Sequence, residues 1–319
     1  MSLPVAIEAI EAARERIAGA AVRTPLVRLA VDDAPAEIWC KLETLQPINS
    51  FKIRGAANAV RSADPELVAR GLITASAGNM AQGVAWVARE LGVPATIAVP
   101  DSAPRAKLDA IARLGGRVVP LPYADWWECI VGSRVEGVEG LFVHPVSDPA
   151  VIAGNGTIGL EILEELPDVD AVVVPYGGGG LVSGIGSALR ARRPQTRVYS
   201  VEPETGAAYA AAHRAGEPVT IDYRASFVDG SGSRRVLDEM WPRAESVVDE
   251  PLVATIEQTA AAVRTLALRM RVIAEGAGAL ATAAALAGAA GGGRVVAVVS
   301  GGNIDASTLA RILEGESPT

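Results

Sequence analysis

Short aliphatic runs alternate along the chain with segments that have a helical hydrophobic pattern. Continuous apolar strands separated by helices are typical of parallel sheets that are buried on both faces. The expected strands are 72–76 (LITAS), 95–100 (ATIAVP), 117–122 (RVVPLP), 171–176 (AVVVPY), 197–202 (RVYSVE) and 294–300 (RVVAVVS). The helical segments between them, at 81–92, 105–116, 157–166 and 181–193, each carry an aliphatic stripe. The pattern predicts a doubly wound α/β protein.

The expected strands form two groups along the chain, and these groups predict two domains. A chain of 319 residues agrees with two domains of about 100–200 residues each. The strands near residues 72, 95 and 117 form one group, and those near 171, 197 and 294 form the other. We therefore expect a small domain at 70–147 and a discontinuous large domain at 1–69 and 148–319, each with a mainly parallel sheet.

Composition narrows the classes of partner. The net charge is −8, so the surface offers no basic field for nucleic acid. Cys40 and Cys129 make neither a metal-type pair nor a disulfide framework, which suits a reducing cytosol. Residues 1–19 have helical spacing without an apolar signal core, and the apolar run 277–290 is too short and glycine-broken to span a bilayer. We expect a soluble, cytoplasmic protein without nucleic-acid or membrane partners.

Histidine chemistry is scarce in this chain. His144 and His213 are the only two histidines, and neither has a motif around it. A Ser-His-Asp triad or a multi-histidine zinc site is therefore disfavoured, and both residues are expected to be structural or surface residues. Lysine is left as the best source of chemistry.

The segment 49–57 (NSFKIRGAA) places Lys52 at the predicted start of a helix. Asn49 or Ser50 is a plausible N-cap, so Lys52 falls in the first turn. The positive end of the helix dipole and the neighbouring Arg54 are expected to lower the pKa of Lys52. A neutral amine can act as a nucleophile, as a base or as a partner in a Schiff base. Taken alone, the segment is also compatible with a solvated surface lysine.

The loops after three of the expected strands are the natural places for a ligand, because ligands bind beyond the carboxyl ends of strands in such sheets. After the strand at 171–176, four consecutive glycines precede a helix. They can turn successive N–H groups toward one anion. The spacing matches neither a nucleotide P-loop nor GxGxxG, so a small phosphate is the better match, with a flexible turn as the alternative.

The other two loops add polar groups at the same edge. The segment 76–83 (SAGNMAQG) combines a hydroxyl, a glycine and an amide at a helix start, which suits a carboxylate or a phenolic oxygen. At 300–303 (SGGN), the Ser300 hydroxyl could meet a ring nitrogen.

The motifs SFKIRGA, SAGNMAQG, GGGGL and VVSGGN occur in this order over nearly the whole chain. Together they resemble the pyridoxal-phosphate enzymes of the tryptophan synthase β fold, and within these most closely the threonine and serine dehydratases and serine racemases. The resemblance implies pyridoxal 5'-phosphate as cofactor, a Schiff base at Lys52 and Phe51 packed beside the cofactor. It also implies a homodimer with a small amino acid as substrate.

The same resemblance assigns the remaining roles. Lys52 and Ser76 are the expected catalytic residues. The expected cofactor contacts are Gly177, Gly178, Gly179, Gly180 and Leu181 at the phosphate, Asn79 at the ring hydroxyl, Ser300 at the ring nitrogen, and Glu275 beside the ring. The expected substrate contacts are Ser76, Ala77, Gly78 and Asn79 at the carboxylate, and Met80, Val146 and Ser147 near the side chain.

A serine at the ring nitrogen can only hydrogen-bond it, which makes the ring a weaker electron sink than a carboxylate partner does. That favours prompt loss of a β-hydroxyl group after Lys52 removes the Cα proton. The expected activity is an ammonia-lyase (dehydratase) reaction, which converts a β-hydroxy-α-amino acid such as threonine or serine to a 2-oxo acid and ammonia. Because no regulatory domain follows the last expected helix, we expect a degradative role.

Departures from the family pattern refine this expectation. Ala77 stands where racemases carry a serine, and alanine cannot transfer a proton, so elimination is favoured over racemisation. Met80 replaces a histidine, while Val146 and Ser147 replace an aromatic residue and an acid. These changes predict a roomier pocket and a bulkier substrate such as phenylserine, although neutral drift is an equal alternative.

Three other readings stay open from the sequence. They are a β-replacement enzyme similar to a cysteine synthase, an amino-acid racemase, and a catalytically silent ligand-binding homologue. Some relatives bind a divalent cation near a residue that matches Glu202, but Ala208 stands where a second acid is expected. Hard cations prefer several oxygen ligands, so we expect no metal.

Overall fold

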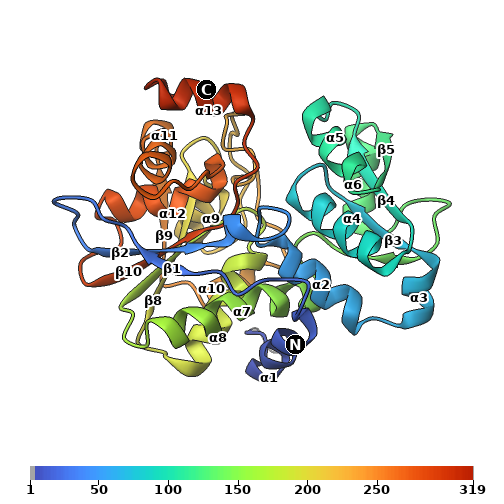
Figure 1. The fold of residues 1–319 in the computed structure, drawn as a ribbon, viewed down its shortest axis with the longest axis horizontal. Coiled ribbons are helices and arrows are strands. Elements are labelled where there is room, and N and C mark those ends of the chain that lie inside the picture. The colour runs from blue at the N-terminus through green and yellow to red at the C-terminus, as the bar shows by residue number, and fades with distance from the viewer. Residues whose placement is uncertain (1–3, 319) are drawn as a thin grey trace.

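The computed structural model describes residues 4–318 and contains two β-sheets that lie in separate lobes (Figure 1). The six-stranded sheet has the order β1-β2-β10-β7-β8-β9, and the four-stranded sheet has the order β5-β4-β3-β6. The strands are β1 (Leu26–Arg28), β2 (Glu37–Leu42), β3 (Leu72–Ala75), β4 (Ala95–Pro100), β5 (Arg117–Leu121), β6 (Leu141–Phe142), β7 (Ala171–Pro175), β8 (Arg197–Pro203), β9 (Glu250–Ala254) and β10 (Arg294–Val299).

Helices flank both sheets, and α2 lies where the two lobes meet (Figure 1). The α-helices are α1 (Ile7–Ile17), α2 (Lys52–Ser62), α3 (Pro65–Arg70), α4 (Asn79–Leu91), α5 (Arg105–Arg113), α6 (Tyr123–Gly132), α7 (Pro149–Glu165), α8 (Gly180–Arg192), α9 (Ala208–Ala215), α10 (Trp241–Glu245), α11 (Ile256–Thr265), α12 (Gly276–Leu286) and α13 (Ala306–Leu313). A 3-10 turn, η1, spans Glu43–Leu45, and a π-helical turn, η2, spans Leu266–Met270.

The six predicted strands are all present, and they divide between the sheets as predicted. β3, β4 and β5 belong to the four-stranded sheet, whereas β7, β8 and β10 belong to the larger one. Of the strand pairs in the described residues, only β1 with β2 is antiparallel. The α/β fold class with mainly parallel sheets is therefore confirmed, whereas the domain boundaries at residues 70 and 147 remain a prediction.

Some elements differ from the sequence expectation. The helix predicted within 1–19 is α1, and residues 1–3 of that segment lie outside the described part. β1, β2, β6 and β9 were not predicted from the sequence. β6 has only two residues, and β9 has a mixed burial pattern, so neither carries a continuous apolar signal.

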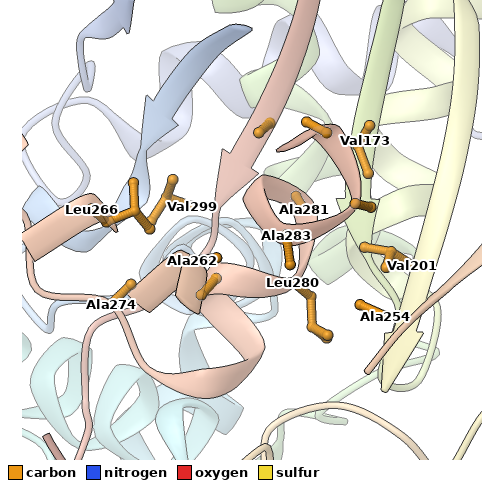
Figure 2. Packing of buried hydrophobic residues seen from close by; sticks show 14 of the residues in the cluster. Val173, Val201, Ala254, Ala262, Leu266, Ala274, Leu280, Ala281, Ala283 and Val299 are labelled. Atoms are coloured by element: carbon orange, nitrogen blue, oxygen red, sulfur yellow. The ribbon is translucent and has the colours of Figure 1, made fainter. Parts of the chain in front are cut away.

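Successive residues of the central strand β10 point to opposite faces, and both faces are covered. Val295, Ala297 and Val299 pack in a cluster with residues of α11 and α12. Figure 2 shows this cluster, in which Leu266 and Leu280 are grouped with Val173, Val201 and Val299 of the strands. Val296 and Val298 pack on the other side with residues of α7 and α8. A strand buried on both faces needs apolar residues at every position, which is why its sequence, RVVAVV, is continuous.

A buried ion network holds α2 in place. Arg54 donates to both carboxylate oxygens of Glu43, with both distances 2.8 Å, and to both of Glu161, at 2.6 and 2.9 Å. Glu161 also pairs with Lys41 at 2.7 Å. Arg54 and Glu43 are fully buried, and such two-pronged contacts fix the orientation of the guanidinium plane. The network therefore ties the helix that begins at Lys52 to η1 and α7.

No helix among residues 4–318 is both long enough and apolar enough to cross a bilayer.

Candidate active site

Lys52 is the first residue of α2, and its side chain is half-buried. Its Nζ donates to the Pro145 carbonyl at 2.8 Å and lies 5.2 Å from the centroid of the Phe51 ring. Burial lowers the pKa of Lys52 to about 8. The direction agrees with the sequence expectation, but the cause differs, because two carboxylates neutralise Arg54.

Lys52 differs from the other lysines of the chain in its surroundings. The chain has three lysines. Lys41 pairs with Glu161, and Lys107 pairs with Asp229 at 2.5 Å. Within the described residues, Lys52 is the lysine that takes part in no salt bridge, so its amine is the one available for covalent chemistry.

The segment before Lys52 is fixed against the loop that follows β10. The Phe51 N–H donates to the Ser300 carbonyl at 3.0 Å, and the Gly302 N–H donates to the Asn49 carbonyl at 2.9 Å. Phe51, and neither Asn49 nor Ser50, occupies the cap position, and its side chain does not cap the helix. The Ser50 hydroxyl nevertheless accepts from the Lys52 N–H at 3.4 Å. Asn49 instead adopts a left-handed conformation with φ 56°, which asparagine tolerates well.

The tetraglycine loop follows β7 and leads into α8, which begins at Gly180. Gly179 has φ 91° and serves as the N-cap. A Cβ built on Gly178 would lie 2.6 Å from the Val146 methyl carbons, and a Cβ on Gly177 would lie 3.0 Å from the Gly230 carbonyl oxygen. Side chains are therefore excluded, and the amides at the helix start have no intrahelical acceptor. The loop has the geometry of an anion-binding nest.

Asn79 is the first residue of α4 and joins two loops of the larger sheet. Its Nδ2 donates to Glu275 Oε1 at 2.7 Å, and its Oδ1 accepts from Asn303 Nδ2 at 2.7 Å. Asn303 Nδ2 also donates to the Ile48 carbonyl at 2.9 Å. The amide of Asn79 is thereby fixed with its nitrogen as the donor, and one N–H of that nitrogen remains for a ligand.

Burial raises the pKa of Glu275 to about 7, although the hydrogen bond from Asn79 acts in the opposite direction. The ordinary value is 4.5, so the folded state holds a proton that the unfolded state releases between these values. Stability from this group is present below pH 4.5 and is lost as pH rises through about 7.

We expect Glu275→Gln to remove this pH dependence from the apoprotein while its amide oxygen still accepts from Asn79. The free energy of unfolding of wild type should fall between about pH 5 and about pH 8 by on the order of 3 kcal/mol more than that of the variant. Urea unfolding of both proteins at both pH values measures this effect. The contributions of other titrating groups are the same in the two proteins and cancel in the comparison. An equal pH dependence in the two proteins would contradict the assignment.

The loop expected to receive a carboxylate begins directly after β3. Ser76 Oγ accepts from the Gly78 N–H at 3.2 Å, and Ala77 is half-buried. Val146 and Ser147 lie in the segment between β6 and α7, and Val146 packs against Gly178. The Met80 side chain is buried in the core shared by α2 and α4, so this residue lies beneath the loop.

Ser300 and Leu181 are buried at the ends of their loops. Glu202 accepts from the backbone N–H groups of Tyr209 and Ala210 at 2.9 and 2.8 Å, at the start of α9. Through the residues that the structure describes, no group of three or more His, Cys, Asp or Glu side chains is arranged to hold a metal ion.

Comparisons with known proteins agree with this site. The family model of pyridoxal-phosphate-dependent enzymes matches residues 17–301. An L-threonine ammonia-lyase of Thermotoga maritima is 39% identical over 314 residues, which cover 97% of this chain and 78% of that protein. The catabolic L-threonine dehydratase of Escherichia coli is 37% identical over 319 residues, covering 97% of this chain and 96% of that protein. The structure of maize serine racemase superposes with a TM-score of 0.88 at 30% identity, covering 98% of this chain and 97% of the other.

The chain belongs to the pyridoxal-phosphate-dependent enzymes. The resemblance found in the sequence, the cofactor and the assignment as a lyase of the threonine/serine dehydratase type are thus confirmed. The described residues also fit the cofactor. Side chains are excluded from the glycine loop, where built Cβ atoms would clash, Lys52 forms no salt bridge within residues 4–318, and Asn79 has a second N–H besides the one that it donates to Glu275.

Two features of the site were missed in the sequence. Asn303 was noted only as part of its loop, and its contact with Asn79 spans 224 residues along the chain. The buried partners of Arg54 were missed because a single arginine in a helix gives no sign of burial. The motif order could place these loops at one edge, but not the side-chain contacts between them.

Proposed function

We propose that this protein is an ammonia-lyase that dehydrates and deaminates a β-hydroxy-α-amino acid to a 2-oxo acid and ammonia. The observation that carries the proposal is the position of Lys52, a lysine of lowered pKa held outside any described salt bridge. The similarity to an L-threonine ammonia-lyase and an L-threonine dehydratase supports threonine as one substrate.

When bound, pyridoxal phosphate supplies an electron sink for the carbanion formed at the substrate Cα. Lys52 would hold the cofactor covalently, and its neutral amine would serve as the base for the proton at the substrate Cα. The backbone N–H groups of Gly177 to Gly180 and Leu181, at the start of α8, would hold the phosphate. Asn79 would donate to the ring hydroxyl, and Ser300 would hydrogen-bond the ring nitrogen.

The turn formed by Ser76, Ala77 and Gly78 receives the substrate carboxylate at the start of α4, where the helix dipole favours an anion. Ala77 carries no exchangeable proton, so it cannot reprotonate Cα as the serine of racemases at this position would. Elimination of the β-hydroxyl group is therefore favoured over racemisation.

By the resemblance, Val146 and Ser147 would lie near the substrate side chain, where residues smaller than the family's aromatic residue and acid favour a bulky substrate. Because Met80 is buried in the core, these two small residues carry the pocket argument. We expect kcat/KM for phenylserine to exceed that for threonine by about tenfold, which corresponds to burial of one additional apolar group.

A coupled assay of ammonia and 2-oxo acid with L-threonine, L-serine and phenylserine tests both levels of the proposal. Ammonia release without an added thiol supports elimination and excludes a β-replacement enzyme. A clear preference for threonine over phenylserine would contradict the bulky-substrate part alone.

We also propose a homodimer in a reducing compartment. Cys40 and Cys129 are both free and buried, which suits such a compartment, and dimerisation is an expectation from the family. Light scattering of the purified protein tests the oligomeric state.

A further inference from the structure

His144 lies in the segment that connects the two sheets. It comes two residues after β6, and Asp148 caps the following helix α7 by accepting from the Ala150 N–H at 2.7 Å. The ring is buried, and three polar groups of the segment that follows converge on the single lone pair of its Nδ1. The donors are the Val146 N–H at 3.1 Å, the Ser147 N–H at 2.9 Å and the Ser147 hydroxyl at 3.1 Å.

These contacts define the protonation state of the ring. A backbone N–H can only donate, so Nδ1 must present its lone pair to Val146 and Ser147. The ring is therefore neutral, with its proton on Nε2. A proton on Nδ1 would face two N–H groups and open the turn.

The turn ordered by His144 touches both halves of the cofactor site. The Pro145 carbonyl accepts from Lys52 Nζ at 2.8 Å. The methyl groups of Val146 lie against Gly178, and a Cβ built on Gly180 would lie 2.8 Å from the Val146 carbonyl oxygen. Residues 145–146 thus bridge the reactive amine and the phosphate loop.

We propose that His144 is a positioning residue, whose Nδ1 folds residues 145–147 into the turn that sets the distance between Lys52 and the tetraglycine loop. The inference deepens the proposed function, because it assigns a residue to the same cofactor site. Without this nitrogen, the N–H groups of Val146 and Ser147 lose their shared acceptor, and the turn that carries Pro145 and Val146 is no longer held. Cofactor affinity then falls, because the Lys52 amine and the tetraglycine loop must be held at the correct distance from each other to bind one cofactor molecule.

The test uses His144→Phe and His144→Asn, since the asparagine amide oxygen can replace Nδ1 as acceptor and phenylalanine cannot. Pyridoxal phosphate is titrated into each apoprotein, and Kd is obtained from the visible band. We expect Kd to rise about tenfold or more in His144→Phe and to return within about threefold of wild type in His144→Asn. His213→Phe is the matched control, because that histidine contacts Glu245 outside the site and its loss should leave Kd unchanged.

Wild-type Kd in His144→Phe, or equal weakening in both His144 variants, would overturn the proposal. If His144→Phe does not fold, the comparison of wild type with His144→Asn across pH replaces it. Burial lowers the pKa of His144, against the opposing effects of Glu239 and Asp148, and Lys52 lowers it further. Below this pKa, wild type should lose more cofactor affinity than His144→Asn does, whereas equal losses would contradict the role of Nδ1.

Both measurements use cofactor binding and need no substrate turnover. A protein that binds pyridoxal phosphate with the expected His144 dependence, yet releases no ammonia, would refute the lyase proposal and leave the positioning role intact. If the wild-type enzyme is active but His144→Phe leaves Kd unchanged, the lyase proposal stands and the positioning role of His144 is refuted.

Discussion

Replacing Lys52 with alanine is expected to abolish turnover, with kcat/KM falling by at least ~10⁴-fold, because the variant loses both the covalent attachment point and the base for the Cα proton. Free cofactor can still occupy the phosphate cradle, so binding should weaken without disappearing. Ammonia release and the visible spectrum of the reconstituted protein measure the two effects separately.

The matched control is Lys107→Ala. Lys107 pairs with Asp229, and its loss leaves the amine of Lys52 in place. This variant should keep the visible band of the bound cofactor. If Lys52→Ala retains the wild-type band, or if Lys107→Ala loses it, the assignment of the reactive amine is wrong.

Arg54→Met is expected to destabilise the protein by about 3–5 kcal/mol, since it leaves the carboxylates of Glu43 and Glu161 buried without their partner. Lys41 remains as a partner for the charge of Glu161, which it contacts at 2.7 Å, whereas Glu43 has no such ion pair with Lys41. Urea unfolding of the apoprotein measures the loss, and fluorescence with circular dichroism checks that the two probes give coincident transitions.

Arg61→Met serves as the comparison within the same helix. Arg61 is exposed and donates to backbone carbonyls of Arg16 and Ala18. Its replacement should cost about 0.5 kcal/mol. Similar losses for the two variants would show that the buried network contributes no more than a surface arginine.

The alternation of apolar runs with helical segments made the core of the fold predictable. β10 shows why: with both faces covered, every position from Val295 to Val299 must be apolar, and the run is visible without any partner. β2 contains a buried lysine, Lys41, which the strand tolerates because the side chain forms an ion pair with Glu161. Such a charge conceals a buried strand from any pattern of hydrophobicity.

The candidate site was predictable as four loops but not as a network of contacts. Gly177 to Gly180 and Lys52 have local signals, a glycine run before a helix and a lysine at a helix start. The contact of Asn79 with Glu275 joins residues 196 positions apart, and no local pattern encodes it. The acceptor role of His144 likewise depends on the path of the backbone after β6, which the sequence did not reveal.

The cause of the lowered pKa of Lys52 shows the same limit. The helix start and Arg54 suggested a positive field, but Arg54 turns to Glu43 and Glu161, and burial lowers the pKa instead. The predicted direction of the shift is correct, but its cause is the packing around Lys52, which the sequence does not show.

The most direct test of the central claim is to reduce the holoprotein with borohydride and locate the cofactor-bearing lysine by peptide mass spectrometry. With three lysines in the chain, the result is unambiguous. The account predicts that the modified peptide contains Lys52 and that the reduced protein releases no ammonia from any substrate. Modification at Lys41 or Lys107, or no modification in a protein that still turns over, would contradict it.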